Sequence, residues 1–315
     1  MRSGPVFKRL LIPVDDSVPS VNAQELAVSI AKLFNSKVTV LYVVSHEFMI
    51  PEVASLVAEI ETQGFAPGQI ARGEYSMPRQ IPFSSGVTMK KGMLSEINNS
   101  YHQRADGIVA EAKRLFNEEG IDADHVIIEH QDAADTIISQ GEEGNYDLII
   151  MGRSGEKEEG PHLGSIAEKV SRHADVPVLI TGEKRKVSTI VVAFDGSEDA
   201  EKALSYAEAL ARKTRAKMTL LYVQEPGLFK LKPETVKQIG SKILSKAAEK
   251  IKGIEFNQRI ESGDPSKIIS QIAEKEDYDL IAMGSKGQGG IRRFLLGSVS
   301  EHVLHYSNHA VLIVK

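Results

Sequence analysis

The sequence predicts an α/β protein of two tandem domains, each a doubly wound parallel sheet of five strands. Three observations support this fold class. The 315 residues repeat themselves in order, each repeat alternates short apolar runs with amphipathic stretches, and several apolar runs are continuous. Continuous runs such as LIIM at 148–151 and LIAM at 280–283 are typical of strands covered by helices on both faces.

The repeat rests on four pairs of matching segments. Leu10–Ser17 matches Ile190–Ser197 and Val38–Val43 matches Met218–Val223, both 180 residues apart; Tyr146–Gly155 matches Tyr278–Gly287 at 132 residues, and Val176–Thr181 matches His309–Val314 at 133. The change of offset gives the first copy 48 extra residues after its second strand. We therefore place the first domain at residues 1–183 and the second at 187–315, joined by the basic linker Glu183–Lys186.

The elements of the second copy follow from its periodicity. Strands are expected at about residues 189–194, 217–223, 255–261, 279–283 and 310–314. The helix between the first two strands carries apolar residues at helical spacing: Ala203, Leu204, Ala207, Leu210 and Ala211. Glu198 and Asp199 stand in its first turn, where carboxylates complement the helix dipole. The first copy has the same helical pattern in Ala23, Leu26, Ala27, Ile30, Ala31 and Phe34.

The extra segment of the first copy, at about residues 45–100, is rich in Gly, Pro, Ser and Met and has no sustained period of 2 or 3.6. We expect it to be mostly loop, a partly ordered surface excursion without chemistry. A lid or partner-binding element is the alternative.

Composition excludes several classes of protein. A net charge of −5 gives no global basic field, so neither nucleic acid nor a membrane surface is favoured as a partner. The absence of cysteine excludes disulfides, a thiol nucleophile and cysteine-ligated metals. No stretch approaches the ~20 apolar residues of a membrane span, and the N-terminal apolar run is too short for a signal peptide, so we expect a cytoplasmic protein. The basic residues Lys8, Arg9 and Lys184–Lys186 are expected to be solvated strand flanks.

Candidate binding residues follow the strands, because ligands of open α/β sheets sit beyond the carboxyl ends of the strands. Asp195 and its twin Asp15 could accept a ribose hydroxyl, although an aspartate there can also form an Asx turn. Backbone groups of Val223 and Val43 could bind an adenine edge. A glycine loop, Gly284-x2-Gly287, precedes Gly297-Ser298 at the start of the last helix. Such a loop admits phosphates, and a helix N-terminus binds anions.

The serine at that helix start has a plain alternative role. Ser298-x-x-Glu301 and Ser165-x-x-Glu168 both fit a capping box, in which the serine and the glutamate bond to backbone N–H groups. Capping alone does not explain the two upstream glycines at fixed spacing. The three C-terminal histidines His302, His305 and His309 have no nearby carboxylate pattern, so we expect surface or core histidines and no metal site.

The motif Gly284-x2-Gly287-x9-Gly297-Ser298 resembles the ATP-binding signature of universal stress proteins, and the repeat segments resemble that family over nearly the whole chain outside 45–100. The resemblance implies an adenine nucleotide alpha hydrolase-like fold and an adenine-nucleotide site. The implied site residues are Ala193, Asp195, Val223, Met283, Gly284, Lys286, Gly287, Gly297, Ser298, Val299 and Ser300. It assigns Asp195 to ribose or base, Val223 to adenine, and the residues from Gly284 onward to phosphates that would carry magnesium or manganese. It also implies a pseudo-dimer paired through the fifth strands, at about 178–181 and 310–314, and a homodimer remains open.

The first copy departs from this signature. It has one residue fewer between its glycines, and its loop at 153–163 carries a net charge of −1 where 285–296 carries +3. Carboxylates near a triphosphate oppose binding. Ser300 is replaced by Ala167. The equivalent candidates are Asp15, Val43, Gly152, Gly155, Gly164 and Ser165. We expect the second site to bind ATP, and the first to be weaker, selective for a less charged nucleotide such as AMP or ADP, or empty.

Three functions remain open at this point. The first is an ATP-binding regulatory protein of the stress response, in which nucleotide occupancy controls an unknown protein partner. The second is a slow ATP hydrolase or another enzyme that uses adenine nucleotides, although the loop offers charge stabilisers such as Lys286 and no base. The third is a nucleotide-free dimerisation scaffold. No P-loop motif, GxGxxG after a first strand, GxSxG or HExxH is present, so no catalytic residue is predicted.

Overall fold

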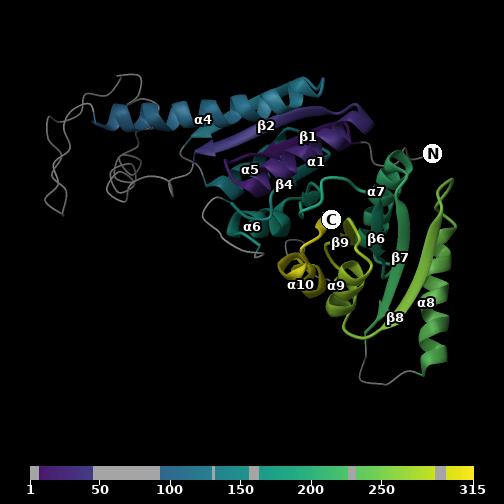
Figure 1. The fold of residues 1–315 in the computed structure, drawn as a ribbon. Coiled ribbons are helices and arrows are strands. Elements are labelled where there is room, and N and C mark those ends of the chain that lie inside the picture. Colours follow the sequence, from purple (N-terminus) through teal and green to yellow (C-terminus); the bar gives the residue numbers. More distant parts are fainter. Residues whose placement is uncertain (1–6, 45–92, 130–131, 156–162, 226–231, 288–295) are drawn as a thin grey trace, which may run out of the picture.

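A computed structural model of the chain describes residues 7–44, 93–129, 132–155, 163–225, 232–287 and 296–315 (Figure 1). The first copy contains β1 (Arg9–Pro13), α1 (Val18–Phe34), β2 (Lys37–Val44), α4 (Met93–Glu118), β3 (Ala123–Glu129), α5 (Ala133–Glu143), β4 (Leu148–Met151), α6 (Ser165–His173) and β5 (Val178–Ile180). The second contains β6 (Thr189–Ala193), α7 (Glu198–Thr214), β7 (Lys217–Gln224), α8 (Pro233–Ala248), β8 (Phe256–Ser262), α9 (Pro265–Lys275), β9 (Leu280–Gly284), α10 (Ser298–Tyr306) and β10 (Ala310–Val314).

The strands form one ten-stranded sheet in the order β3-β2-β1-β4-β5-β10-β9-β6-β7-β8. Pairing within each copy is parallel, and β5 pairs with β10 antiparallel. Leu179 faces Leu312, its own counterpart in the repeat, so the junction has the local twofold arrangement of two like strands. The predicted fold class and the predicted pairing through the fifth strands are confirmed.

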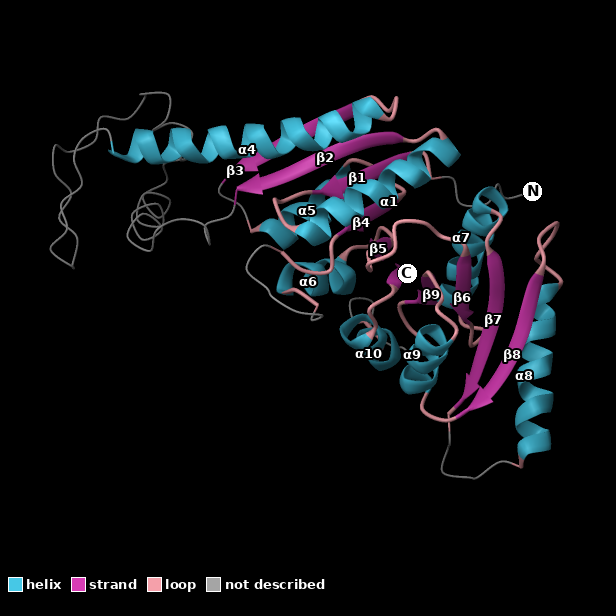
Figure 2. Cartoon of the chain, in the orientation of Figure 1, coloured by secondary structure: helices cyan, strands magenta, loops and turns pink. Residues whose placement is uncertain are grey.

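Helices cover both faces of this sheet (Figure 2). The buried side chains form two clusters, one beneath α1, α4, α7 and α8 and the other beneath α5, α6, α9 and α10. Each cluster takes residues from both copies, because the sheet is continuous across the junction. Phe7 adds to the first cluster by packing edge-on against Phe34 of α1 and Tyr206 of α7. The two copies therefore share their hydrophobic cores.

The two long helices α1 and α7 start and end in equivalent ways. Ser17 and Ser197 are their N-caps, and each hydroxyl accepts a backbone N–H three residues on. Asn35 and Arg215 adopt the left-handed conformation at the C-caps, with φ of 52° and 58°. These caps fix where α1 and α7 begin, directly after the strand-end aspartates.

The expectation of loop at 45–100 is wrong in part. Residues 45–92 lie outside the described residues, but Met93–Ser100 already belong to α4. Leu94, Ile97 and Tyr101 stand at helical spacing and lead into Ala105, Val109, Ala112 and Phe116, which are buried in the first core cluster. The start of α4 therefore carries an apolar helical period that the expectation of loop did not use.

The linker also differs from expectation, since two of its basic residues are not simply solvated. Lys184 lies 2.7 Å from an oxygen of Asp277 and 2.9 Å from an oxygen of Asp279. Arg185 reaches Glu25 of α1 at 2.6 Å. The linker is thus fastened to both copies by ion pairs.

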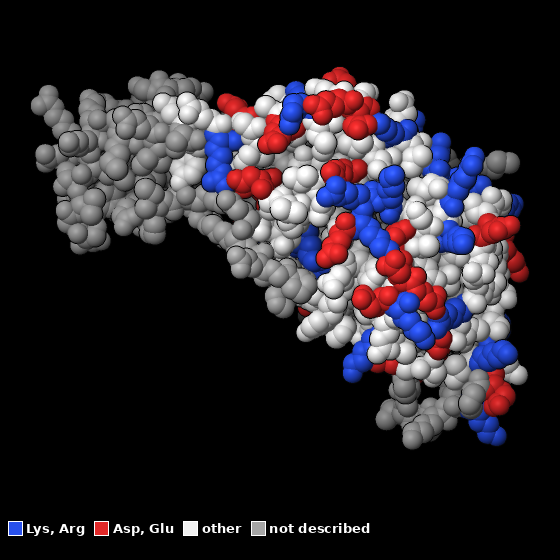
Figure 3. Space-filling model, viewed as in Figure 1, with Lys and Arg blue, Asp and Glu red and all other residues white. Residues whose placement is uncertain are grey.

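The charged surface is mixed. On the face drawn in Figure 3, acidic and basic side chains are interspersed over the described residues. No helix among these residues has the length and apolar character needed to cross a membrane.

Candidate functional site

Each copy carries a pocket at the carboxyl ends of its strands. The pocket of the second copy has a volume of about 870 Å³. It is lined by all eleven residues predicted for this site: Ala193, Asp195, Val223, Met283, Gly284, Lys286, Gly287, Gly297, Ser298, Val299 and Ser300. A volume of this size lies in the range of small-molecule sites. The structure therefore brings the whole predicted set together around one cavity, the second pocket.

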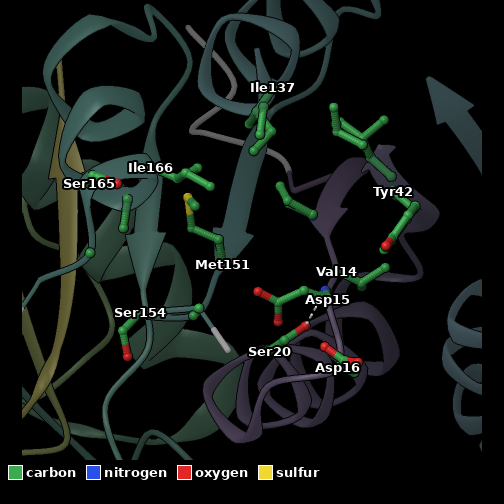
Figure 4. Close-up of a pocket in the computed structure, with 18 of the residues that line it drawn as sticks. Val14, Asp15, Asp16, Ser20, Tyr42, Ile137, Met151, Ser154, Ser165 and Ile166 are labelled. Atoms are coloured by element: carbon green, nitrogen blue, oxygen red, sulfur yellow. Dashed lines mark hydrogen bonds between the residues drawn. The ribbon is translucent and has the colours of Figure 1, made fainter. Parts of the chain in front are cut away.

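The equivalent first pocket is much smaller, about 140 Å³. It too is lined by every residue predicted for it: Asp15, Val43, Gly152, Gly155, Gly164 and Ser165. In Figure 4 the carboxylate of Asp15 points away from Tyr42, toward the side of the pocket where Met151 and Ser154 lie.

The strand-end aspartates use one carboxylate oxygen locally. Oδ1 of Asp195 accepts the backbone N–H of Ser197 at 2.9 Å, and Oδ1 of Asp15 accepts that of Ser17 at 3.0 Å, so the Asx turn weighed from sequence is present. Oδ2 lies on the side of the glycine loop. A Cβ placed on Gly287 would lie 2.8 Å from Oδ2 of Asp195. The second oxygen of each carboxylate therefore lies beside the second glycine of its loop, Gly287 or Gly155.

Backbone groups of the second strand face the same cavity. The carbonyl of Leu221 accepts the N–H of Phe194, just past the end of β6, at 2.9 Å. Backbone groups of a strand alternate in direction from one residue to the next, so those of Val223, two residues on, point to the same side. Because β6 has ended there, they face the pocket, which Val223 lines. The bond from Val14 to Leu41 gives Val43 the same orientation in the first copy.

The first glycine of each loop has a packing role that the sequence interpretation missed. A Cβ on Gly284 would lie 2.7 Å from backbone atoms of Asp199 and Ala200, and one on Gly152 would lie 2.7 Å from the backbone of Pro19. These glycines let β9 and β4 approach the N-terminal turns of α7 and α1, the helices that follow the neighbouring strands β6 and β1. The second glycines, Gly287 and Gly155, instead face the strand-end carboxylates.

The capping boxes considered as an alternative role for the last helix of each copy are not formed. The N-caps are Gly297 and Gly164, without a side-chain hydrogen bond, and Ser298 and Ser165 are the first helical residues. The two glutamates accept from Arg172 instead: it donates to Glu168 of its own helix at 2.8 Å and to Glu301 of α10 at 2.7 Å. Among the described residues, the N-cap Gly297 therefore places no side chain over the first-turn N–H groups of α10, which begins at the second pocket.

Ser300 is placed differently from a simple phosphate ligand. Its side chain is buried, and its hydroxyl donates to the carbonyl of Gly284 at 2.9 Å. It therefore joins α10 to the glycine loop. Ala167 stands at the equivalent position of the first copy and cannot make this bond.

Arg153 corrects the charge comparison of the two loops. Its side chain is buried and turns away from the first pocket into the second copy, where it donates to the carbonyl of Leu304 at 2.5 Å and to that of His309 at 3.4 Å. Burial lowers the pKa of Arg153 to about 10, so the guanidinium stays charged at neutral pH. The positive charge of Arg153, which was counted for the first loop, therefore lies at the junction between the copies, while Lys286 lines the second pocket. The other charged residues of both loops lie outside the described residues.

Several lining residues carried no sequence signal. Tyr222, Glu225, Pro265 and Ile269 line the second pocket, and Ser20, Arg104 and Ile137 line the first. Burial and the charge of Asp195 raise the pKa of Tyr222. The lining residues at the N-termini of α5 and α9 could have been predicted, since Asp132 and Asp264 cap these helices and are 132 residues apart, an offset of the repeat. Arg104 could not, because it reaches the pocket from α4.

Two of the C-terminal histidines have carboxylate neighbours that the sequence pattern did not show: His305 lies 3.7 Å from Glu168, and His309 lies 3.9 Å from Glu274. Potential ligand atoms of His305, Glu168 and Glu301 lie within 4.8 Å of one another, at the junction of α6 and α10. Arg172 already bonds both carboxylates there. These contacts make the cluster an ion-pair network between the two copies.

Fold and pockets together define a doubly wound α/β protein with a pocket at the strand ends of each copy. A sequence model of the universal stress protein family matches residues 7–182 and 186–315. The chain therefore belongs to the universal stress protein family, whose members act in the stress response, and it carries the family's domain twice.

Similar proteins agree with this assignment. A universal stress protein of Synechocystis is 27% identical over 216 residues, covering 67% of this chain and 72% of that protein. One from Methanocaldococcus jannaschii is 32% identical over 148 residues, covering 44% of this chain and 87% of that one. The crystal structure of a universal stress protein from Archaeoglobus fulgidus matches with a TM-score of 0.66 and 24% identity, over 98% of this chain and 97% of that chain. The structural match supports the fold.

Proposed function

We propose that the chain is an adenine-nucleotide-binding regulatory protein of the stress response, with its principal site in the second pocket. The observation that carries this proposal is the convergence of the eleven predicted residues around one cavity of about 870 Å³. Residues 187–315 would hold this site, and residues 1–183 would hold the weaker one.

The three parts of a nucleotide fit three features of the second pocket. The backbone of Val223 faces the cavity and offers the donor and acceptor that an adenine edge needs. Oδ2 of Asp195 lies on the side of Gly287 and can accept a ribose hydroxyl. The first turn of α10, without a side-chain cap, and the ammonium of Lys286 suit the phosphates. Magnesium or manganese would be carried by the phosphates and would offset their charge.

Regulation follows from the position of the phosphate loop. Ser300 and Gly284 already connect α10 to this loop by a hydrogen bond. Phosphates held between Gly287 and Gly297 would fix the loop, and a protein partner could read the changed surface. A second chain is one such partner, as a homodimer.

The test is isothermal titration of ATP, ADP and AMP, each with magnesium, into the parent and into Asp195→Ala and Asp15→Ala. We expect one ATP site per chain and a loss of about 10- to 100-fold in affinity for Asp195→Ala, since hydrogen bonds to charged groups contribute ~1.5–3 kcal/mol. Asp15→Ala should leave the second pocket unaffected.

Each other outcome selects a different account. Absence of binding in the parent would contradict the proposal and leave the nucleotide-free scaffold. Two equal sites would contradict the inequality of the pockets. Steady release of inorganic phosphate from ATP, abolished in Asp195→Ala, would favour the hydrolase.

A further inference from the structure

An ion pair joins two elements at the first pocket. Arg104 of α4 lies with a guanidinium nitrogen 2.6 Å from Oδ2 of Asp16, in the loop between β1 and α1. Both residues line the first pocket, and Asp16 is the direct neighbour of Asp15. The pair therefore connects α4 to the same loop that presents the strand-end carboxylate.

The second copy provides an internal comparison. The counterpart of Asp16 in the repeat is Gly196, which adopts a left-handed conformation with φ of 84° and has no side chain to pair. The second pocket is about 870 Å³, against about 140 Å³ for the first. The smaller pocket is thus the one in which the β1–α1 loop is bound to the neighbouring helix.

The exposure of the pair sets the strength that it can have. The side chains of Arg104 and Asp16 are 41% and 39% exposed. Ion pairs of this exposure contribute little free energy, so this pair can weaken ligand binding at the first pocket but cannot prevent it. A ligand that enters beside Asp15 would displace the pair at a modest free-energy cost.

We propose that Arg104 and Asp16 are specificity-determining residues of the first pocket, and that their ion pair, the Arg104–Asp16 latch, makes this pocket bind adenine nucleotides more weakly than the second. The inference rests on the proposed function. The latch belongs to the first copy alone, since it needs both the side chain at position 16 and the helix that follows the extra segment.

The test measures the first pocket in a chain whose second pocket is blocked by Gly287→Glu. This substitution puts a carboxylate beside Asp195, and its Cβ would meet only the end of the Asp195 side chain, so we expect the fold to be retained. Isothermal titration with AMP and ATP then compares this chain with the same chain carrying Asp16→Asn or Asp16→Gly. We expect Asp16→Asn to raise the affinity about twofold to fivefold, the worth of an exposed pair. Asp16→Gly, which also removes volume, should raise it further.

A double-mutant cycle separates the latch from a direct ligand contact. If the pair is the latch, Arg104→Gln raises the affinity as Asp16→Asn does, and the double variant gains no more than either single one. If Arg104→Gln lowers the affinity, Arg104 binds the nucleotide itself and the inference is overturned.

A matched control tests whether any pair between these helices has the same effect. Lys32 of α1 pairs with Glu119, directly after α4, at 48% and 46% side-chain exposure, and neither residue lines the first pocket. Glu119→Gln should leave the affinity unchanged. If the first pocket shows no measurable binding in the blocked chain that carries Asp16→Gly, the inference is overturned. The proposed function still stands in that case if the parent, with its second pocket unblocked, binds the nucleotide. If the unblocked parent binds no nucleotide, both fail together.

Discussion

The two pockets carry the same motif at the same place in the fold, yet their volumes differ, about 870 Å³ against about 140 Å³. The glycines, the serines at the helix starts and the Asx turns of Asp195 and Asp15 are matched, but Ser154 and Ala167 stand in place of Lys286 and Ser300. Further differences lie in what surrounds the motif: α4 places Arg104 at the first pocket, and Arg153 turns away from it. A duplicated site can thus diverge through its neighbours while its motif stays recognisable.

The scaffold, in contrast, repeats closely. Asp147 accepts the backbone N–H groups of Lys8 and Arg9, and Asp279 accepts those of Ser188 and Thr189. Both aspartates hold the start of the first strand of their copy. Equivalent substitutions in the two copies therefore distinguish the shared scaffold from the divergent pockets.

Phe7 and its counterpart Val187 test the asymmetry of the junction. Phe7 is fully buried between Phe34 and Tyr206, with ring centroids 4.6 and 5.4 Å apart. Phe7→Ala should lower the free energy of unfolding by about 3–5 kcal/mol. Val187→Ala removes less buried surface and should cost roughly 1–2 kcal/mol. Urea denaturation would measure both free energies of unfolding. Equal losses in the two variants would contradict the larger packing role of Phe7.

Gly284 and Gly152 should behave alike, because both permit close packing of strand on helix. Gly284→Ala and Gly152→Ala each place a Cβ 2.7 Å from backbone, which should lower the free energy of unfolding by about 1–3 kcal/mol. Gly297→Ala is the control, since its Cβ would lie 3.1 Å from the carbonyl of Ser285. Thermal denaturation should place the control nearest the parent; a neutral Gly284→Ala would refute the packing role.

Asp279 and Asp147 should differ in their dependence on pH. Burial raises the pKa of Asp279, but Lys184 and two backbone amides more than offset this, so the pKa lies below its ordinary value. The carboxylate therefore stabilises the fold above the unfolded pKa of about 3.9, and the stabilisation is lost as the pH falls through the folded pKa. Asp279→Asn should cost about 1–2 kcal/mol at pH 7 and less at pH 3.

Urea titrations at the two pH values measure this difference. Asp147→Asn is the matched control; no lysine among the described residues pairs with Asp147, so this variant should lose less at pH 7. A cost for Asp279→Asn that is the same at pH 3 would exclude the ionised carboxylate as its source.

Ser300 and Ala167 give the smallest effect. Ser300→Ala removes the hydroxyl that donates to Gly284, which should lower the free energy of unfolding by about 0.5–1.5 kcal/mol. Nucleotide affinity should fall by less than tenfold, because the hydroxyl is already engaged within the protein. Denaturation and titration of the same samples compare the two losses. A large loss of nucleotide affinity with unchanged stability would indicate that the Ser300 hydroxyl binds the phosphates directly.

The strands, the repeat and the positions of both pockets could be predicted from the sequence. The strand predicted at 217–223 is observed at Lys217–Gln224, and all predicted lining residues meet at a pocket. Prediction succeeded here because strand periodicity, strand-end aspartates and glycine spacing are local, and a parallel sheet gathers its strand ends at one edge.

The tertiary structure decided which partner each polar side chain takes. Arg153 bonds Leu304 across 151 residues, Arg172 bonds Glu301 across 129, and Arg104 bonds Asp16 across 88. Such contacts leave no local pattern, because they depend on how α4, α6 and α10 pack once the sheet is continuous. The sequence by itself determined the fold, the place of both pockets and the substitutions between them; packing between distant helices decided which contacts surround each pocket.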